Sequence, residues 1–273
     1  MNYRFFDYKY RINGFVSDLF STPHIIYIAA VFILSFAAAY ALRSTDHARI
    51  RQWLKIQSVF TVLLEAAKIC WESFYDITTG QGFNWGGLLP IYACSLFIYM
   101  LPLAAWGRGK GKACAGAFLT TIGLLFGGIG VIYCNGLNFY PFWTFGAFYS
   151  LYFHAAMFFT GVLLLMTGYV QPEWKNVNLA MVPVFLLALA AIPVNYALGS
   201  DYMQIYSGEG VPVYEELAAF LAGKGLRPVY TVIMLLTYVP LAALVVAVSR
   251  RLKAVLSGKE SVKLAPFRLL PRH

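Results

Sequence analysis

Long apolar runs separated by short polar connections dominate the chain, and they determine the predicted fold. An α-helix needs about 20 apolar residues to cross the hydrocarbon layer of a bilayer, and seven runs have roughly that length. They are Pro23–Leu42, Ile50–Cys70, Gly86–Trp106, Ala113–Tyr133, Ala147–Tyr169, Val177–Leu198 and Val229–Ser249. The second run is the most polar, but the basic residues at its start can reach the nearer membrane interface. We therefore predict an all-α fold, a polytopic membrane helix bundle with seven transmembrane helices.

The remaining segments flank this transmembrane domain, which we place at residues 23–250. Residues 1–22 are rich in Tyr and Phe, carry charges of both signs and lack a continuous apolar core. We expect them to form an interfacial segment and not a signal peptide. Residues 251–273 are predicted to form a basic cytoplasmic tail. The one long connection is Tyr196–Arg227, in which Val213–Leu221 has a helix-like pattern.

The basic residues are distributed unevenly between the two sides of the predicted bundle. The connections that follow odd-numbered runs, together with the tail, carry Lys and Arg. Of the connections after even-numbered runs, one has no Lys or Arg, one has no charge, and the third is net acidic. Lys and Arg concentrate on the cytoplasmic side of membrane proteins. We therefore predict an extracytoplasmic N-terminus and a cytoplasmic C-terminus.

Composition supports a membrane protein and excludes several other classes. The chain of 273 residues is 60% hydrophobic and only 12% charged, whereas soluble domains are about 45–50% apolar and about 25% charged. The net charge of +9 suits anionic lipid headgroups, and its scatter over loops argues against nucleic-acid binding. We expect a multi-pass protein of the cell membrane. No metal, nucleotide or haem motif is present, so we expect no cofactor and no metal site.

Two chemically reactive residues, Cys94 and His154, lie inside apolar runs. Polar groups in the hydrocarbon layer are costly, and those present often have a function. Cys94 follows Gly86, Gly87 and Pro90, a combination that allows an irregular first turn. With a helical rise of 1.5 Å per residue, Cys94 and His154 both lie about 10–12 Å below the extracytoplasmic end of their runs. They can therefore share one level of the bilayer.

Three further polar residues, Glu65, Lys68 and Asn195, fall in the same half of the bilayer. Glu65 and Lys68 are three residues apart and can neutralise each other, or they can orient a site and hold a phosphate or carbonyl oxygen. Asn195 can bridge helices, donate to an oxyanion or orient His154. Each cysteine can also be a small packing residue, and His154 a buried residue bonded across helices. A disulfide between the cysteines at positions 70 and 134 is a further possibility.

A Cys and a His within hydrogen-bond reach form a pair suited to acyl transfer. The imidazole takes the thiol proton, and the thiolate attacks an ester to give a thioester. His154 then deprotonates the acceptor hydroxyl or water. In the outer half of a bilayer such a pair meets lipid esters more readily than soluble substrates.

The stretch Leu88–Leu96 resembles the signature LP-x-x-x-C-S/N-L of the YwaF-type bacterial integral membrane proteins, which are related to the eukaryotic transmembrane protein 164 family. Phe153-His154 and Val194–Tyr202 resemble two further blocks of that family. Asp201 stands where the family has Asn, and Tyr92-Ala93 replace the His-Leu usual before the cysteine.

The resemblance implies Cys94 as the acyl-accepting nucleophile and His154 as the base of a phospholipid acyltransferase. Its partners would be a phospholipid acyl donor, an acyl acceptor and the bilayer. Glu65, Lys68, Asn195 and Tyr202 are then candidates for substrate-binding or supporting residues.

Two other classes of function stay open from the residues. In a transporter or channel, the intramembrane polar residues would line a pathway, and Pro183, Pro193 and Pro240 would break the last two spans. No internal repeat supports that class. A receptor or structural bundle is suggested only by the number of spans. The sequence leaves the oligomeric state undetermined.

Overall fold

The computed structural model describes residues 3–9, 14–80 and 82–256, and every regular element in these ranges is a helix. The α-helices are α1 (Thr22–Ala41), α2 (His47–Thr78), α3 (Trp85–Leu88), α4 (Leu96–Trp106), α5 (Gly109–Thr120), α6 (Ile122–Ile132), α7 (Phe145–Met166), α8 (Lys175–Leu198), α9 (Pro212–Gly223) and α10 (Arg227–Leu256). Short 3-10 turns, η2 (Asn135–Asn138) and η3 (Tyr202–Gln204), lie in two connections. The all-helical prediction is confirmed.

Among the described residues, five helical segments are long and apolar enough to cross a membrane. They are α1, the segment Gly109–Asn138 that contains α5 and α6, α7, α8 and α10. The second predicted run lies within α2, which has 32 residues but a more polar composition. The third run holds α4, an apolar helix of 11 residues. Each predicted run thus contains helix, while the number of seven spans stays a prediction.

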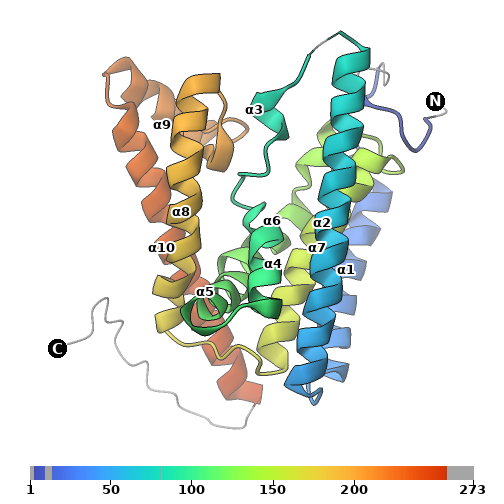
Figure 1. The fold of residues 1–273 in the computed structure, drawn as a ribbon, viewed down its shortest axis with the longest axis vertical. Coiled ribbons are helices and arrows are strands. Elements are labelled where there is room, and N and C mark those ends of the chain that lie inside the picture. The colour runs from blue at the N-terminus through green and yellow to red at the C-terminus, as the bar shows by residue number, and fades with distance from the viewer. Residues whose placement is uncertain (1–2, 10–13, 81, 257–273) are drawn as a thin grey trace.

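Most of the helices run up and down the long axis of the molecule, so their connections gather at two ends, whereas α5 is seen nearly end-on close to the lower end (Figure 1). The connections α1–α2, α4–α5 and α7–α8 lie at one end, together with the last turns of α10. These are the connections that carry the Lys and Arg residues counted above. We call this end the basic end. The described part of the N-terminal segment lies at the other end, near the top of α2.

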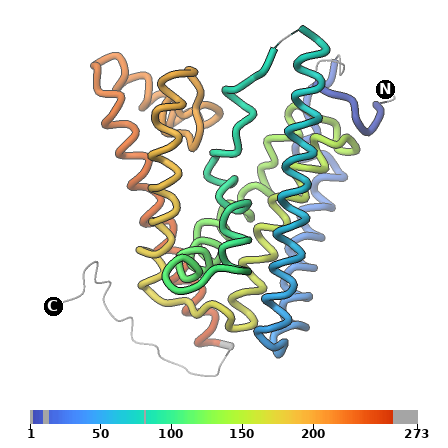
Figure 2. The backbone as a smooth tube through the Cα atoms, viewed as in Figure 1, coloured from blue at the N-terminus to red at the C-terminus, as the bar shows by residue number. Residues whose placement is uncertain are grey.

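The third run differs from a continuous helix over a longer stretch than the sequence predicts. Helix α3 has only four residues, and Leu89–Ser95 then follows a non-helical path before α4 begins (Figure 2). Pro90 has no N–H to donate, and proline disfavours a helical conformation for the residue before it. Because a helical rise does not apply here, the depth predicted for Cys94 from that rise is wrong in its premise.

The breaks predicted in the last two spans are absent. Helix α8 continues through Pro183 and Pro193, and α10 continues through Pro240. Transmembrane helices tolerate proline because neighbouring groups satisfy the freed backbone positions. An unpredicted break occurs instead at Thr121, where φ is −123° and ψ is −93°, and it separates α5 from α6.

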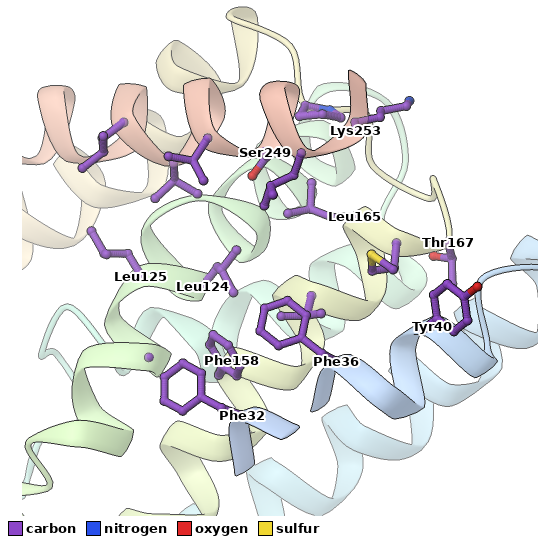
Figure 3. A pocket seen from close by; sticks show the side chains of 18 of the residues that line it. Phe32, Phe36, Tyr40, Leu124, Leu125, Phe158, Leu165, Thr167, Ser249 and Lys253 are labelled. Atoms are coloured by element: carbon purple, nitrogen blue, oxygen red, sulfur yellow. The ribbon is translucent and has the colours of Figure 1, made fainter. Parts of the chain in front are cut away.

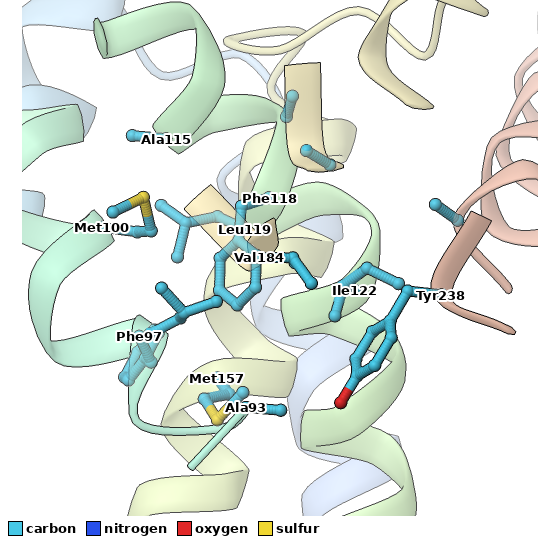
Figure 4. Packing of buried hydrophobic residues seen from close by; sticks show 14 of the residues in the cluster. Ala93, Phe97, Met100, Ala115, Phe118, Leu119, Ile122, Met157, Val184 and Tyr238 are labelled. Carbon is cyan, nitrogen blue, oxygen red and sulfur yellow. The ribbon is translucent and has the colours of Figure 1, made fainter. Parts of the chain in front are cut away.

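The main hydrophobic core joins α4, α5, α7, α8 and α10. Figure 4 shows some of its side chains, including Phe97 of α4, Phe118 of α5 and Tyr238 of α10. The sequence between residues 212 and 223 forms α9, which confirms the helix-like pattern in the long connection. Helix α10 continues to Leu256, into the residues predicted as a basic tail from 251 onward, and residues 257–273 lie outside the described ranges.

A smaller aromatic cluster joins the N-terminal segment to the end of the bundle opposite the basic end. The Tyr8 ring stacks on Tyr75 with centroids 5.3 Å apart, and its hydroxyl donates to Asp76 Oδ1 at 3.3 Å. Phe5 and Phe6 contact the ring of Phe145 at the start of α7. The N-terminal segment is therefore packed on the bundle by aromatic contacts.

Candidate functional site

Cys94 lies in the non-helical stretch between α3 and α4, and several elements converge on it. Its side chain is partly exposed. Electrostatic interactions link its thiol to Glu65 and Lys68 of α2, to Tyr149 of α7 and to Tyr238 of α10. The N–H of the next residue, Ser95, donates to the Tyr92 carbonyl oxygen at 2.9 Å. The thiol therefore lies among helices α2, α7 and α10 and keeps accessible surface.

Tyr202, in the connection after α8, fastens the stretch that carries Cys94. Its hydroxyl donates to the Trp85 carbonyl oxygen at 2.8 Å and accepts from the Leu89 N–H at 3.1 Å. Its ring lies 4.7 Å from that of Tyr92, centroid to centroid. Burial raises the pKa of the Tyr202 hydroxyl, so this group stays protonated and able to donate. Tyr202 thus holds both ends of α3 without being a reacting group.

Asn195 in turn holds Tyr202. Its Nδ2 donates to the Tyr202 carbonyl oxygen at 2.9 Å, and its Oδ1 accepts from the Tyr202 N–H at 2.8 Å. Oδ1 also accepts from the Ser200 hydroxyl at 3.3 Å. These local bonds occupy the amide of Asn195, which is only 1% exposed. The structure therefore assigns Asn195 to the Tyr202 loop and shows no bond from it to His154.

Asp201 organises the same loop, at the position where this chain departs from the family pattern. Oδ1 accepts from the N–H groups of Tyr206 and Ser207, and Oδ2 accepts from that of Glu209. A carboxylate supplies both oxygens as acceptors, whereas an asparagine amide supplies only one. The aspartate therefore has a local structural reason to be present.

Glu65 and Lys68 do not form the neutralising pair that their spacing allows. The Tyr149 hydroxyl donates to Glu65 Oε2, across from α7 to α2. Lys68 instead pairs with Glu72, with Nζ and Oε2 2.8 Å apart, and its Nζ lies 5.8 Å from the centroid of the Tyr149 ring. Lys68 thus pairs with Glu72, four residues further along α2, and Glu65 accepts from Tyr149 of α7. The pairing of Glu65 with Lys68 therefore does not form. Both Glu65 and Lys68 interact electrostatically with the Cys94 thiol.

The bonding of His154 on α7 identifies the ring nitrogen that can act as a base. Nδ1 lies 2.8 Å from the Ser150 carbonyl oxygen, one turn earlier on the same helix. A carbonyl oxygen only accepts, so Nδ1 carries the hydrogen and Nε2 of the neutral ring holds a free lone pair. Nε2 has no hydrogen-bond partner among the described residues and is not a buried atom. Of the two alternatives considered for His154, a bond across helices is therefore not formed, because the ring bonds within α7.

The helix α6 makes room for the imidazole at Gly130. A Cβ atom built on Gly130 would lie 2.0 Å from His154 Cδ2 and 2.6 Å from Nε2. Such a close approach is possible only without a side chain. The sequence signal is present, because Gly127, Gly128 and Gly130 form a cluster of small residues typical of close helix contact in membranes. Sequence reasoning did not use that signal.

Cys94 and His154 lie on neighbouring elements without a direct bond. The Phe97 ring, one turn after Cys94, lies 5.5 Å from that of Phe153, the residue before His154. Within the described ranges no hydrogen bond joins the Cys94 sulfur to the imidazole. Both side chains are partly exposed. One contact between aromatic rings therefore links the two segments, and both reactive residues keep accessible surface.

The remaining cysteines play other roles. All four are free thiols, so the disulfide considered between Cys70 and Cys134 does not form. Cys134 is fully buried, and its sulfur donates to the Ser150 hydroxyl at 3.2 Å. Among the described residues no cluster of His, Cys, Asp and Glu side chains could hold a metal ion.

Comparison with known proteins gives one match. The family model described as the TMEM164 family matches residues 19–249, which include every element from α1 to most of α10. A search of curated proteins and a search of solved structures each found no match.

Proposed function

The chain belongs to the TMEM164 family, and from this membership and the geometry around Cys94 we propose that it is a membrane-embedded acyltransferase for lipid acyl groups. Family membership and the five apolar helices make it a membrane protein. The proposal adds seven spans, an extracytoplasmic N-terminus, a cytoplasmic basic end and a place in the cell membrane. Cys94 is then in the extracytoplasmic half of the bundle.

The observation that carries the proposal is the setting of the Cys94 thiol in a helix break. A cysteine that only packs needs no such break, no neighbouring charges and no accessible surface. Here the sulfur lies in a non-helical stretch, keeps accessible surface and interacts electrostatically with Glu65 and Lys68. A nearby positive charge such as that of Lys68 favours the thiolate.

The reaction proceeds through a thioester on Cys94. The thiol gives its proton to His154 Nε2 while the sulfur attacks the carbonyl carbon of the donor ester. The tetrahedral intermediate collapses, the C–O bond breaks, and the leaving lysolipid oxygen takes the proton back from the imidazole. The acceptor hydroxyl then gives its proton to Nε2 and attacks the thioester, which transfers the acyl group and restores the thiol with that proton.

The two reactive groups must approach each other for this chemistry. Catalytic hydrogen bonds are often long without substrate and tighten only when it binds. The free lone pair on Nε2 and the exposed surface of both side chains support such an approach. Lys68 interacts electrostatically with the Cys94 thiol, and its ammonium group can hold a lipid phosphate there if it exchanges Glu72 for the phosphate.

Trapping of the acyl-enzyme tests the proposal. Purified protein in lipid nanodiscs receives a phospholipid with a fluorescent acyl chain, and mass spectrometry of peptides locates any hydroxylamine-sensitive adduct. We expect the adduct on Cys94, and we expect its loss in Cys94→Ser and in His154→Ala. The matched control Cys114→Ser, at a partly exposed thiol on α5, should keep it. Equal labelling of all cysteines, or an adduct that persists in Cys94→Ser, contradicts the acyltransferase and favours transport or packing.

A further inference from the structure

A large cavity lies on the bundle away from Cys94, between α1 and α10. Its volume is about 860 Å³, and neither Cys94 nor His154 lines it. Helix α1 forms one wall with Phe32 and Phe36, α10 forms the other with Val248, and α6 and α7 form the floor (Figure 3). We call it the α1–α10 groove. Ligand pockets in proteins have volumes of about 300–1,000 Å³, so this cavity is large enough to bind a ligand.

The walls of the α1–α10 groove are almost entirely hydrocarbon. Phe36 of α1 is 49% exposed, Ile129 of α6 is 49% exposed, and Val248 of α10 is 47% exposed. Leu124 and Leu165 line the floor (Figure 3). Such surfaces bind apolar chains and do not offer the hydrogen bonds that a polar metabolite needs.

Positive charge is confined to one end of the groove. Arg43 and Lys253 line it at the basic end of the bundle, and no Asp or Glu is among the lining residues. The Arg43 guanidinium lies 3.9 Å from the centroid of the Tyr40 ring, and its Nη1 donates to the Tyr40 carbonyl oxygen at 2.8 Å. Lys253 donates to Gln171 in the α7–α8 connection. Arg43 is thus anchored at the mouth by a neighbour that bears no negative charge, and Lys253 also lines the mouth.

The length of the groove matches one leaflet of a bilayer. Phe32 and Arg43 are eleven residues apart along α1 and its end, which corresponds to about 16 Å of helical rise. Half of the hydrocarbon layer is about 15 Å thick. A chain that lies along the α1 wall from Phe32 therefore ends at headgroup level, where Arg43 lies.

We propose that the α1–α10 groove binds an anionic phospholipid of the leaflet at the basic end. The acyl chain lies between Phe36 and Val248, and the phosphate contacts Arg43 and Lys253. Charge complementarity favours an anionic headgroup, because the lining holds two cationic side chains and no Asp or Glu. The site is separate from the thiol and does not depend on the proposed acyl transfer.

Native mass spectrometry of the full-length protein tests the headgroup preference. Detergent-solubilised protein is titrated with phosphatidylglycerol or with phosphatidylcholine of identical acyl chains. We expect several-fold higher occupancy for phosphatidylglycerol, and we expect Arg43→Gln/Lys253→Gln to reduce it to the phosphatidylcholine level. The control Arg49→Gln/Lys110→Gln removes two exposed charges outside the lining and should keep the preference. Equal occupancy of the two lipids in the unmodified protein, or an unchanged preference in the first double variant, overturns the proposal.

A second pair of variants tests the acyl chain. Val248→Trp fills the groove, whereas Val232→Trp places the same side chain on an exposed position of α10 outside it. We expect loss of bound phosphatidylglycerol only in Val248→Trp, and unchanged binding in Cys94→Ser. Inorganic phosphate at equal concentration should not displace the lipid, and displacement by it would show recognition of the phosphate alone. Retained lipid in Val248→Trp would equally contradict binding in the groove.

Discussion

The imidazole of His154 rests against the backbone of Gly130, at a place where a Cβ atom would lie 2.0 Å from a ring carbon. The position of the proposed base is therefore set from α6, a helix that contributes no reactive group. Two contacts fix the orientation of the imidazole. The Ser150 carbonyl oxygen accepts from the protonated ring nitrogen, and the backbone at Gly130 lies against the ring.

Gly130→Ala should displace the imidazole and lower acyl transfer by at least tenfold. A methyl group cannot fit beside the ring, so His154 must change rotamer or α6 must move away. Turnover of a fluorescent phospholipid measures the effect. The control is Gly128→Ala on the same helix, where the nearest atom, Phe158 Cδ2, would be 3.4 Å away. Equal activity in both variants would contradict a positional role for Gly130.

Cys94→Ala should abolish acyl transfer at little cost in stability. Alanine fills much of the volume of the thiol, and the partly exposed side chain leaves no sealed cavity. We expect a melting temperature within a few degrees of the unmodified protein by fluorescence-detected thermal unfolding. A collapse in expression or in melting temperature would instead make Cys94 a packing residue.

Tyr202→Phe should loosen the stretch that carries the thiol. The change removes two hydrogen bonds and leaves the Leu89 N–H and the Trp85 carbonyl oxygen without this partner. A buried polar group left unsatisfied costs about 1–3 kcal/mol. We expect a lower melting temperature and faster reaction of Cys94 with a maleimide. Tyr196→Phe, at a half-exposed ring on α8, is the control and should change neither quantity.

Tyr149→Phe should disturb the charge beside the thiol. Glu65 is 5% exposed and loses the hydroxyl that donates to it. A buried carboxylate without a partner is costly, so we expect lower stability. Combining it with Glu65→Gln should recover part of the loss, because the double variant carries no buried charge there. If the two changes are strictly additive in thermal unfolding, the Tyr149–Glu65 contact has no energetic weight.

The predicted orientation can be measured with single added cysteines at the two ends of the bundle. Thr79→Cys, at the end of α2, should react with a membrane-impermeant maleimide in intact cells. Lys110→Cys, at the basic end, should react only after the membrane is permeabilised. The protein without either change supplies the background. The opposite pattern would reverse the topology and place Cys94 in the other leaflet.

The sequence predicts helices well where lipid dictates the structure. A segment in hydrocarbon must satisfy its own backbone groups, so an apolar run of sufficient length is nearly always helix. The run Pro23–Leu42 accordingly corresponds to α1, Thr22–Ala41, and Val177–Leu198 corresponds to α8, Lys175–Leu198. The same rule does not predict how the helices pack side by side. It therefore does not tell whether Cys94 and His154 lie close together.

The contacts that build the site depend on packing and were not predictable from spacing along the chain. Tyr149 lies 84 residues from Glu65, and Tyr202 lies 113 residues from Leu89. Nothing in the local sequence distinguishes Tyr149 among 19 tyrosines. Spacing also predicted an ion pair between Glu65 and Lys68, which a closer partner on each side replaced.

The attachment of α3 to Tyr202 has a mechanical consequence. The proposed nucleophile, Cys94, is tethered to the loop after α8, whereas the imidazole of His154 is carried by α7. Any shift of α8 relative to α7 therefore alters the gap between sulfur and nitrogen directly, with no need for either side chain to rotate. The rate at which the Cys94 thiol reacts would then depend on the distance between α7 and α8.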